Sequence, residues 1–233
     1  LKDVASDQLA KEQVELSELP EGWKWIRMGE IIASMKNGLY KPAKYYGEGI
    51  PSLRMYNIHE GNITLDNVRR VRLSSDEIED YSLVAGDILL NRINSRELVG
   101  KAAVIPQGIG TIIFEAMNIR IRVRRETVEP KYLTYYLLTS EARRRIELKV
   151  KQTVGMGTVD QSDIASWPLP LAPIMEQVQI VKRLDFILSY VDQLARNTKQ
   201  VSDKIDQLQQ SILTKAFQGE LIPQDPNGHN RSS

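Results

Sequence analysis

The sequence predicts an α+β protein in which a β-rich domain is followed by a long C-terminal coiled-coil helix. From Trp23 to about Val128, short apolar runs alternate with Gly, Asn, Pro and Asp, a pattern typical of many short strands. Towards the C-terminus, ten positions repeat with alternating spacings of four and three, the heptad pattern of a helix that buries one edge against another helix. These seam positions are Ile180, Leu184, Ile187, Val191, Leu194, Thr198, Val201, Ile205, Leu208 and Ile212.

Composition limits the class of protein. The chain has 233 residues, of which 42% are hydrophobic and 26% charged, so it can bury a substantial core. It contains no cysteine, which excludes disulfides and thiolate nucleophiles and fits a reducing cytoplasm, the expected location. No apolar run approaches the roughly 18 residues of a membrane-spanning helix and no signal peptide opens the chain, so we expect no membrane partner.

The chain divides into five predicted segments. Residues 19–23 read as a turn with an aromatic anchor, which sets the first boundary. Pro168, Pro170 and Pro173 fix φ and lack amide donors, so this stretch cannot be helical and forms a stiff junction. The expected segments are a tail or short helix at 1–19, the β-rich domain at 20–167, the Pro-rich junction at 168–173, a long dimerising helix at 174–222 and a disordered tail at 223–233.

Local patterns predict four elements within the β-rich domain. Residues 119–124 alternate strictly between apolar residues and Arg, which predicts a half-buried strand with one basic face. The stretch from Glu129 to about Val150 predicts one helix. Residues 155–158 read as a loop, either a hinge or a close approach to phosphate, and Asp87 as part of a turn before a strand.

The long helix begins near Ile174, ends at about Gln218 and has Gly219 as its expected C-terminal cap. Its length corresponds to a rod of roughly 65 Å. Nine of the ten seam positions are apolar, and the polar Thr198 at the tenth can fix the register of pairing. Because no other predicted helix is comparably long, we expect a second copy in an antiparallel two-fold dimer rather than an intramolecular bundle.

Positive charge gathers in the middle of the chain. Residues 20–169 hold 22 Lys and Arg against 18 Asp and Glu, a net charge of +4, whereas the whole chain carries +1. The arginines cluster at 69–72, 120–125 and 143–145. Clustered arginines suit phosphate contacts, but a solvated surface explains the same charge, so composition leaves both interpretations open. The consecutive arginines at 143–145 cannot share one helix face, and we expect them to be partly structural.

Motifs of catalysis and metal binding are missing. The sequence has no Gly-rich dinucleotide or triphosphate motif and no nucleophile elbow. Its two histidines, His59 and His229, are too few for a histidine triad or a zinc site. Asp87, Glu97 and Lys101 come nearest to a nuclease site, but the Glu-to-Lys spacing does not place the two side by side on a strand face. We expect no catalytic residue, metal or cofactor in this chain.

Several segments, in order, resemble the specificity (S) subunits of Type I restriction-modification systems. The resemblance covers about residues 19–222, and the order and spacing of its short motifs make it specific. The motifs are LPEGW at 19–23, MGEI at 28–31, IPSLRMYNI at 50–58, GDILLNR at 86–92, NS at 94–95, VGK at 99–101, PLPLAP at 168–173, EQVQIV at 176–181 and ILTKAFQGEL at 212–221.

The resemblance implies sequence-specific DNA recognition without catalysis. In this family a target recognition domain reads one half of a split double-stranded DNA target, and the helix acts as a ruler and binds the methyltransferase (M) subunits. S-adenosylmethionine would be held by that methyltransferase partner, and restriction (R) subunits are a further expected partner. Full-length members usually carry two recognition domains and two helices. This chain therefore resembles a half-subunit whose homodimer directs DNA methylation at an interrupted palindromic site.

Three segments carry the side chains that we expect at the DNA. Residues 91–96 are the first choice for base reading, because Arg pairs with guanine and Asn with adenine, and an Asn/Ser turn is the alternative. Residues 37–46 read as a flexible loop for phosphate contact, with an ordinary loop as the alternative, and residues 54–57 can join the same surface. The candidates are Lys41, Lys44, Tyr45, Arg54, Tyr56, Asn57, Arg92, Asn94, Ser95 and Arg96.

Two other functions stay open. A catalytic DNA methyltransferase or nuclease subunit predicts activity from this chain alone with its cofactor. A coiled-coil scaffold without a DNA role predicts no salt-dependent DNA binding, whereas a specificity subunit loses affinity steeply as salt rises.

Overall fold

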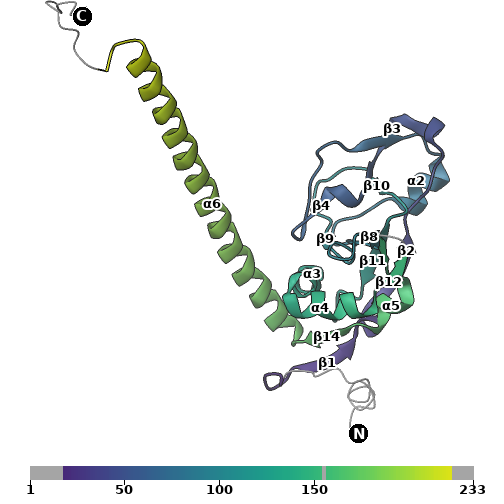
Figure 1. Cartoon of the computed structure of the whole chain (residues 1–233). Helices are drawn as coiled ribbons and strands as arrows, with labels where there is room; N and C mark the ends of the chain where they lie inside the picture. The colour runs from purple at the N-terminus through teal and green to yellow at the C-terminus, as the bar shows by residue number, and fades with distance from the viewer. Residues whose placement is uncertain (1–17, 154–155, 222–233) are drawn as a thin grey trace, which may run out of the picture. The chain divides into compact units, whose positions relative to one another are not determined.

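The computed structural model describes residues 18–153 and 156–221, and the chain forms two compact units, Leu1–Val181 and Lys182–Ser233. Strands and short helices build the first unit, and most of one long helix builds the second (Figure 1). The predicted α+β fold with a long C-terminal helix is confirmed. The predicted tails, apart from residues 18 and 19, lie outside the described residues, as do Gly155 and His229.

A four-stranded antiparallel sheet of order β2-β11-β7-β9 is the centre of the first unit. Its inner strand β11 carries Ile119 and Ile121, which are both fully buried in a core that also contains Leu133 and Trp167. The sheet consists of β2 (Ile32–Asn37), β7 (Ile88–Asn91), β9 (Ala102–Val104) and β11 (Asn118–Val123).

A second core joins this sheet to a three-stranded sheet of order β10-β3-β6. Leu89 and Ala103 enter the core from the first sheet, and Leu53 and Phe114 from the second. The elements here are β3 (Tyr46–Leu53), β4 (Ile58–His59), β5 (Asn62–Ile63), β6 (Arg69–Val71), β10 (Ile113–Phe114), α2 (Ser75–Tyr81) and the 3-10 helices η2 (Ala43–Tyr45) and η3 (Met55–Asn57).

The arginines of residues 119–124 alternate with buried apolar residues, as predicted, but part of their basic face is covered. Arg120 is 7% exposed, and its Nη1 donates hydrogen bonds to the backbone oxygens of Ser82 (2.9 Å) and Asp80 (3.3 Å). Arg122 donates from Nε to Asp87 Oδ1 at 2.8 Å, and this hydrogen bond raises the pKa of Arg122. The end of α2 and Ser82 therefore enclose Arg120, whereas the side chain of Arg122 is 39% exposed and Arg124 is exposed.

Residues 129–150 form two helices instead of the single helix predicted. They are α3 (Pro130–Leu138) and α4 (Ser140–Lys149). Thr139 separates them with an extended ψ of 147°, and its side-chain oxygen accepts a hydrogen bond from the Ala142 amide at 3.2 Å. A threonine that caps one helix interrupts the previous one, which apolar periodicity alone does not reveal.

The predicted loop at 155–158 is also wrong. Met156–Thr158 forms strand β13 between β12 (Lys151–Thr153) and β8 (Ile93–Asn94). A Cβ atom on Gly157 would lie 2.7 Å from a side-chain carbon of Val150. Close packing of these segments therefore explains Gly157.

The Pro-rich segment is non-helical, as predicted, and forms a strand of the first unit. This strand, β14 (Pro168–Leu171), pairs antiparallel with β1 (Lys24–Arg27). Tyr132 on α3 donates a hydrogen bond to Pro170 O at 2.5 Å and packs edge-on against Trp23 at a centroid distance of 6.3 Å. The 3-10 helix η1 (Met28–Glu30) follows β1, and α5 (Gln161–Ser166) precedes β14.

Helix α6 runs from Ile174 to Phe217, and its first two turns belong to the first unit. Gly219 has a φ of 75°, as expected of a left-handed residue after a helix end. Among the helices of residues 18–153 and 156–221, none is long and apolar enough to cross a membrane.

Gln177 attaches the start of α6 to the first unit. Its side chain is fully buried, and Nε2 donates to the backbone oxygens of Ala172 (2.8 Å) and Thr127 (3.1 Å). Its Oε1 accepts from the Glu129 amide at 2.9 Å. One side chain thus satisfies backbone groups from two segments on either side of α3.

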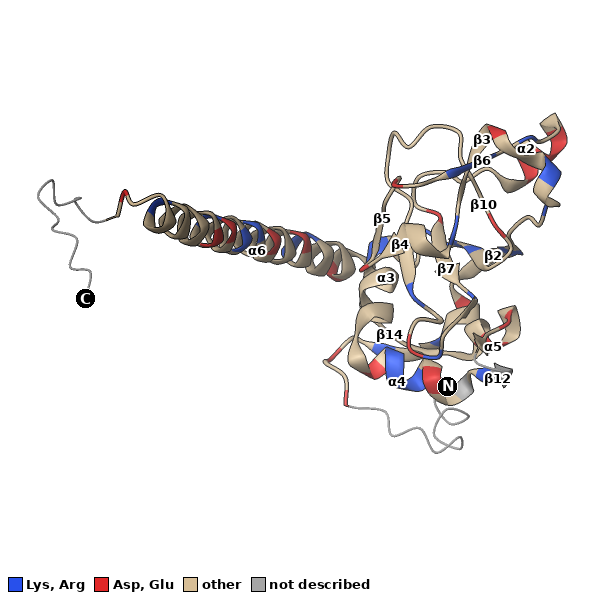
Figure 2. Ribbon diagram, turned by 45° about the horizontal axis from the view of Figure 1, so that its top comes forward, with Lys and Arg blue, Asp and Glu red and all other residues tan. Residues whose placement is uncertain are grey.

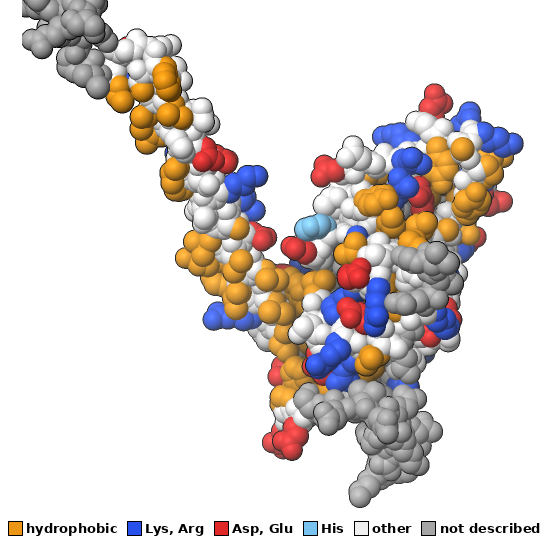
Figure 3. All heavy atoms as spheres, in the orientation of Figure 1, with side chains coloured by type: hydrophobic (Ala, Val, Ile, Leu, Met, Phe, Trp, Pro, Cys, Tyr) orange, Lys and Arg blue, Asp and Glu red, His pale blue; other side chains and the backbone are white. Residues whose placement is uncertain are grey.

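Beyond Leu184, which is half-buried, the apolar side chains of α6 are exposed. Leu194 is 47% exposed, Val201 57% and Ile205 59%. Figure 3 shows apolar side chains recurring along this helix. The described part of the second unit therefore has no buried core of its own, while seam pairing itself stays a prediction.

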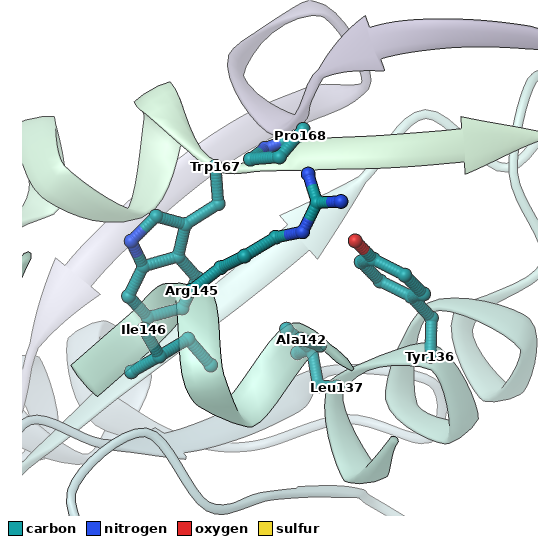
Figure 4. Close-up of a pocket in the computed structure, with 7 residues that line it drawn as sticks. All are labelled: Tyr136, Leu137, Ala142, Arg145, Ile146, Trp167 and Pro168. Carbon is teal, nitrogen blue, oxygen red and sulfur yellow. The ribbon is translucent and has the colours of Figure 1, made fainter. Parts of the chain in front are cut away.

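A small cavity lies where α3 and α4 meet the start of β14 (Figure 4). Its volume is about 10 Å³, near the minimum that holds one water molecule, so it is too small for an organic ligand. Burial raises the pKa of Tyr136, whose hydroxyl lies near the Arg145 guanidinium. The lining residues are Tyr136, Leu137, Ala142, Arg145, Ile146, Trp167 and Pro168.

Candidate nucleic-acid interface

One end of the four-stranded sheet, which we call the asparagine end, gathers three asparagines from three strands. β2 ends at Asn37, β7 ends at Asn91 and β11 begins at Asn118. In the antiparallel register, Asn118 lies opposite Asn91 and Ile119 lies opposite Asn37. The connections that leave these strand ends therefore emerge side by side on a rigid scaffold, which is where binding residues commonly lie.

A buried amide network holds these connections together. Asn91 Nδ2 donates to Met117 O (2.9 Å), Ile93 O (3.2 Å) and Asn118 Oδ1 (3.2 Å). Asn91 Oδ1 in turn accepts from Asn94 Nδ2 at 2.7 Å. Because buried amides are costly to leave without partners, this network fixes the loop that begins at residue 115 relative to β7 and β8.

The loop of residues 115–117 holds two arginines from distant parts of the chain. Arg54 Nε donates to Glu115 Oε2 at 3.0 Å, and the Arg54 guanidinium lies 5.3 Å from the Tyr56 ring centroid. Arg92 donates from its amide to Met117 O at 2.8 Å and from Nη1 to Ala116 O at 3.4 Å. We call Arg54, Tyr56, Arg92, Glu115 and Met117 the arginine surface.

The arginine surface combines charge with exposed apolar area. Tyr56 is 66% exposed and Met117 40% exposed, while the side chain of Arg54 is 30% exposed. Arginine donors beside exposed rings can hold phosphates, read base edges or pack on sugars. These side chains are of types that can contact DNA.

The candidates at 92–96 differ in exposure and in hydrogen bonding. Arg92 joins the arginine surface and Arg96 is exposed. Asn94 is 8% exposed. Its side-chain Nδ2 donates to Asn91 Oδ1, and its Oδ1 accepts from the backbone amide of Ser95 at 2.9 Å. The Ser95 carbonyl accepts from the amides of Leu98 and Val99, which matches the alternative turn interpretation. Asn94 and Ser95 thus shape the loop that connects Arg92 to Arg96.

Asn57 is likewise occupied within the protein. It is 2% exposed, its Nδ2 donates to the backbone oxygens of Thr64 and Asp66 at 3.0 Å each, and its Oδ1 accepts from the Arg54 amide at 2.9 Å. This asparagine shapes the backbone next to Arg54. Its neighbour Tyr56, in contrast, points into solvent.

The segment predicted as a flexible loop at 37–46 is held by side-chain contacts. Lys41 forms an ion pair with Glu77 on α2, which lowers the pKa of Glu77, and lies 4.8 Å from the Tyr45 ring centroid. Lys44 lies 5.4 Å from the same ring, and its carbonyl accepts from Arg72 Nη2 at 2.9 Å. Lys41, Lys44 and Tyr45 therefore lie beside α2, whose charged residues are acidic, and β6, whose charged residues are basic (Figure 2), and none of these contacts is with Arg54 or Arg92.

Two members of the arginine surface, Glu115 and Met117, were missed in the sequence. Their loop follows a two-residue strand, and nothing nearby in sequence marks it as a partner for Arg54, 61 residues earlier. A backbone bridge between Leu39 and Glu115 further brings the 37–46 segment beside this loop.

The other residues considered in the sequence have structural surroundings. Arg143 donates to the carbonyls of Val99 and Glu97 at 2.6 Å each, as expected for a partly structural arginine. Asp87 is buried in the predicted turn and accepts from the Val84 amide at 3.0 Å. Within residues 18–153 and 156–221, no three His, Asp or Glu side chains are grouped so as to hold a metal ion.

Comparison with known proteins identifies the family. The Type I restriction modification DNA specificity domain matches residues 20–207, which include every described strand and most of α6, so the chain belongs to this family. It is similar to the specificity subunit of the Type I restriction enzyme StySPI from Salmonella potsdam, with 30% identity over 204 residues. The EcoKI specificity subunit from Escherichia coli K12 is 29% identical over the same length.

These relatives are longer than the chain. The aligned region covers 87% of this chain but 44% of either relative, so the chain spans less than half of their length. The crystal structure of the HsdS subunit from Thermoanaerobacter tengcongensis shares the fold, with a TM-score of 0.60, 24% identity, and coverage of 90% of this chain and 48% of that one. The resemblance to Type I specificity subunits is thereby confirmed.

Proposed function

We propose that this chain reads one half of a bipartite DNA target as a non-catalytic component of a Type I restriction-modification complex. The observation that supports it most directly is the arginine surface, where Arg54 and Arg92 are held on one loop beside exposed Tyr56 and Met117. Family membership supplies the class of ligand, and the surface supplies the side chains that would contact it.

In this proposal the chain works as two functional parts. Residues 20–167 act as the target recognition domain, 168–173 as the junction and 174–222 as the dimerising helix, with tails at 1–19 and 223–233. Two copies would pair antiparallel along the seam of α6, so that the helix length sets the spacing between two half-sites. The exposed seam residues support this pairing, because an apolar stripe on a long helix needs a partner.

The same proposal assigns the remaining partners. Methyltransferase subunits would dock on the helices and hold S-adenosylmethionine, and restriction subunits would join the complex in the cytoplasm. The name of the StySPI relative places that protein in a restriction enzyme, which supports this assembly for the chain.

DNA binding by the full chain tests the proposal. We expect a labelled duplex to bind with an affinity that falls steeply with salt, since lysine and arginine contacts to phosphate release counterions. Arg92→Ala should weaken binding by about tenfold, the scale of one good base or phosphate contact. Fluorescence anisotropy at several salt concentrations measures both effects.

Arg124→Ala is a matched control. Arg124 is exposed whereas Arg92 is half-buried, but each donates from Nη1 to one backbone oxygen, at 3.1 Å for Arg124 and 3.4 Å for Arg92. Arg124 follows β11 at the end of the strand opposite the asparagine end. Its replacement should change the affinity by less than about twofold. Absence of salt-dependent binding would favour a scaffold, and methyl transfer by the chain alone with S-adenosylmethionine would favour a catalytic subunit.

A further inference from the structure

The two carboxylate oxygens of Glu115 lie in different surroundings. Its Oε2 accepts from Arg54 Nε at 3.0 Å, whereas its Oε1 is buried and has no hydrogen-bond partner among the described residues. The side chain is 17% exposed. Because Oε1 does not reach solvent, Glu115 is placed to act on Arg54 and not on a ligand directly.

The contacts of Arg54 leave one edge of its guanidinium for a ligand. Glu115 occupies Nε, and Tyr56 lies against the guanidinium at 5.3 Å. In the described part of the chain, the Nη1 and Nη2 groups of Arg54 form no other hydrogen bond. Two parallel N–H donors on one rigid plane match the O6 and N7 acceptors of guanine in the major groove.

Restricting Arg54 before DNA binds lowers the entropy that is lost on binding. A free arginine side chain carries about 2 kcal/mol of rotamer entropy, part of which is lost when it docks on a base. The carboxylate on one side and the ring on the other restrict Arg54 before DNA arrives, in the way that supporting contacts preorganise a binding residue.

We propose that Arg54 reads a guanine through its Nη edge and that Glu115 is the positioning residue that fixes this edge. The inference rests on the proposed DNA-binding function and adds a base and a residue pair to it. It separates Arg54 from an arginine that only holds phosphate, because a phosphate contact tolerates lysine, whereas a base contact built on the planar fork of arginine loses that fixed geometry when lysine replaces it.

Selection from a duplex library with a randomised core tests the inference on the full chain. Arg54→Lys should keep the affinity for duplexes without that guanine within about threefold, yet lower the guanine preference at one position by about tenfold or more. Glu115→Ala should lower the preference at that same position by about fivefold, and Glu115→Gln should restore most of it, because the amide oxygen still accepts from Nε. The double variant Arg54→Lys/Glu115→Ala should lose no more than Arg54→Lys alone.

The Lys41–Glu77 pair supplies the matched control. Glu77→Ala removes a carboxylate that is also paired with a cation of the same unit, but the pair lies beside α2 and not on the arginine surface. It should leave the selected sequence unchanged. Thermal melting of each variant confirms that altered selection does not come from unfolding.

Two results overturn the inference alone. One is a wild-type chain that selects a sequence which Arg54→Lys still selects unchanged. The other is a Glu115→Ala variant that weakens all sequences equally, or shifts a position that Arg54→Lys does not. A chain that binds DNA without selecting any sequence, or binds none, contradicts the proposed function itself and the inference with it.

Discussion

The two units of this chain use the same apolar residue types in opposite ways. In the first unit Leu90, Leu133 and Leu169 are fully buried, whereas Leu194 and Leu208 on α6 are 47% and 61% exposed. A long helix gains most of its stability from packing an apolar face, and the described second unit offers no such packing within the chain. The first unit thus buries its apolar residues within itself, whereas the described part of the second unit leaves them exposed, which is why we propose that α6 pairs with a partner.

The apolar area of α6 also changes along its length. Phe186 and Tyr190, which are 66% and 58% exposed, lie outside the seam positions, while Val201 and Ile205 further along belong to the seam. Thr198 donates its hydroxyl to Leu194 O at 2.9 Å, so its polar group is satisfied within the helix. The half of α6 that includes Phe186 therefore presents a wider apolar surface than a two-helix seam needs.

The largest effect is expected from placing charge in the seam. Leu194→Asp together with Val201→Asp removes about 1.5 kcal/mol or more of apolar burial for each side chain in a dimer, and the dissociation constant should rise by roughly a thousandfold or more. Analytical ultracentrifugation should show monomers of the variant and, if α6 pairs as proposed, dimers of the wild type. The first unit should keep its tryptophan fluorescence, since Trp23, Trp25 and Trp167 all belong to it.

Gln193→Asp together with Gln200→Asp is the control for the seam variant. Each site precedes a seam residue by one position and is exposed, so the added charge is the same but points away from the seam. This variant should remain dimeric. Dimers that persist with Leu194→Asp and Val201→Asp would contradict the pairing of α6.

Sequence periodicity predicted α6 well because a long helix repeats one local rule. The heptad pattern identified the helix, and the Pro-rich junction before it and Gly219 after it gave bounds, near Ile174 and about Gln218, that lie within a residue of the observed ones. Shorter elements were less predictable, because tertiary contacts decide them. Thr139 divides one predicted helix by capping the next, and Gly157 belongs to a strand that is packed against Val150.

The arginine surface was predicted in part, since Arg54, Tyr56 and Arg92 were chosen by chemistry. The sequence did not show that the side chains of Asn57 and Asn94 form hydrogen bonds within the protein, to backbone oxygens and to another asparagine side chain. Those partners lie in loops that only the folded sheet brings together. Residue type indicates what a side chain can bind, while burial decides whether it is free to do so.

An intermediate effect is expected where α6 joins the first unit. Gln177→Ala leaves the Glu129 amide and the carbonyls of Thr127 and Ala172 without their partner, so the free energy of unfolding of the first unit should fall by about 2–4 kcal/mol. Urea unfolding followed by tryptophan fluorescence measures it. Gln179→Ala, exposed on the same helix, should change it by less than about 0.5 kcal/mol. Equal losses in the two variants would show that Gln177 does not hold this junction.

The smallest effect concerns the first unit alone: its free energy of unfolding should fall at alkaline pH. Burial raises the pKa of Tyr132 to about 12 from 10.0, and its hydroxyl donates to Pro170 O. The folded state therefore retains a proton that the unfolded state loses above pH 10, so the stabilisation is complete below pH 10 and is lost as pH rises towards 12. At pH 11 the wild type should have lost about 1.4 kcal/mol relative to pH 8 through this group.

Tyr132→Phe isolates this contribution. At pH 8 the variant should unfold with about 1 kcal/mol less free energy than the wild type, because it lacks the hydrogen bond to Pro170. At pH 11 the difference should close, because only the wild type carries the Tyr132 proton, while the buried Tyr136 titrates in both proteins. Urea unfolding of each protein at the two pH values gives the difference directly. A gap that stays constant would mean that Tyr132 ionises no later in the folded chain than in the unfolded one, and the packing of α3 against β14 would then be looser than its contacts indicate.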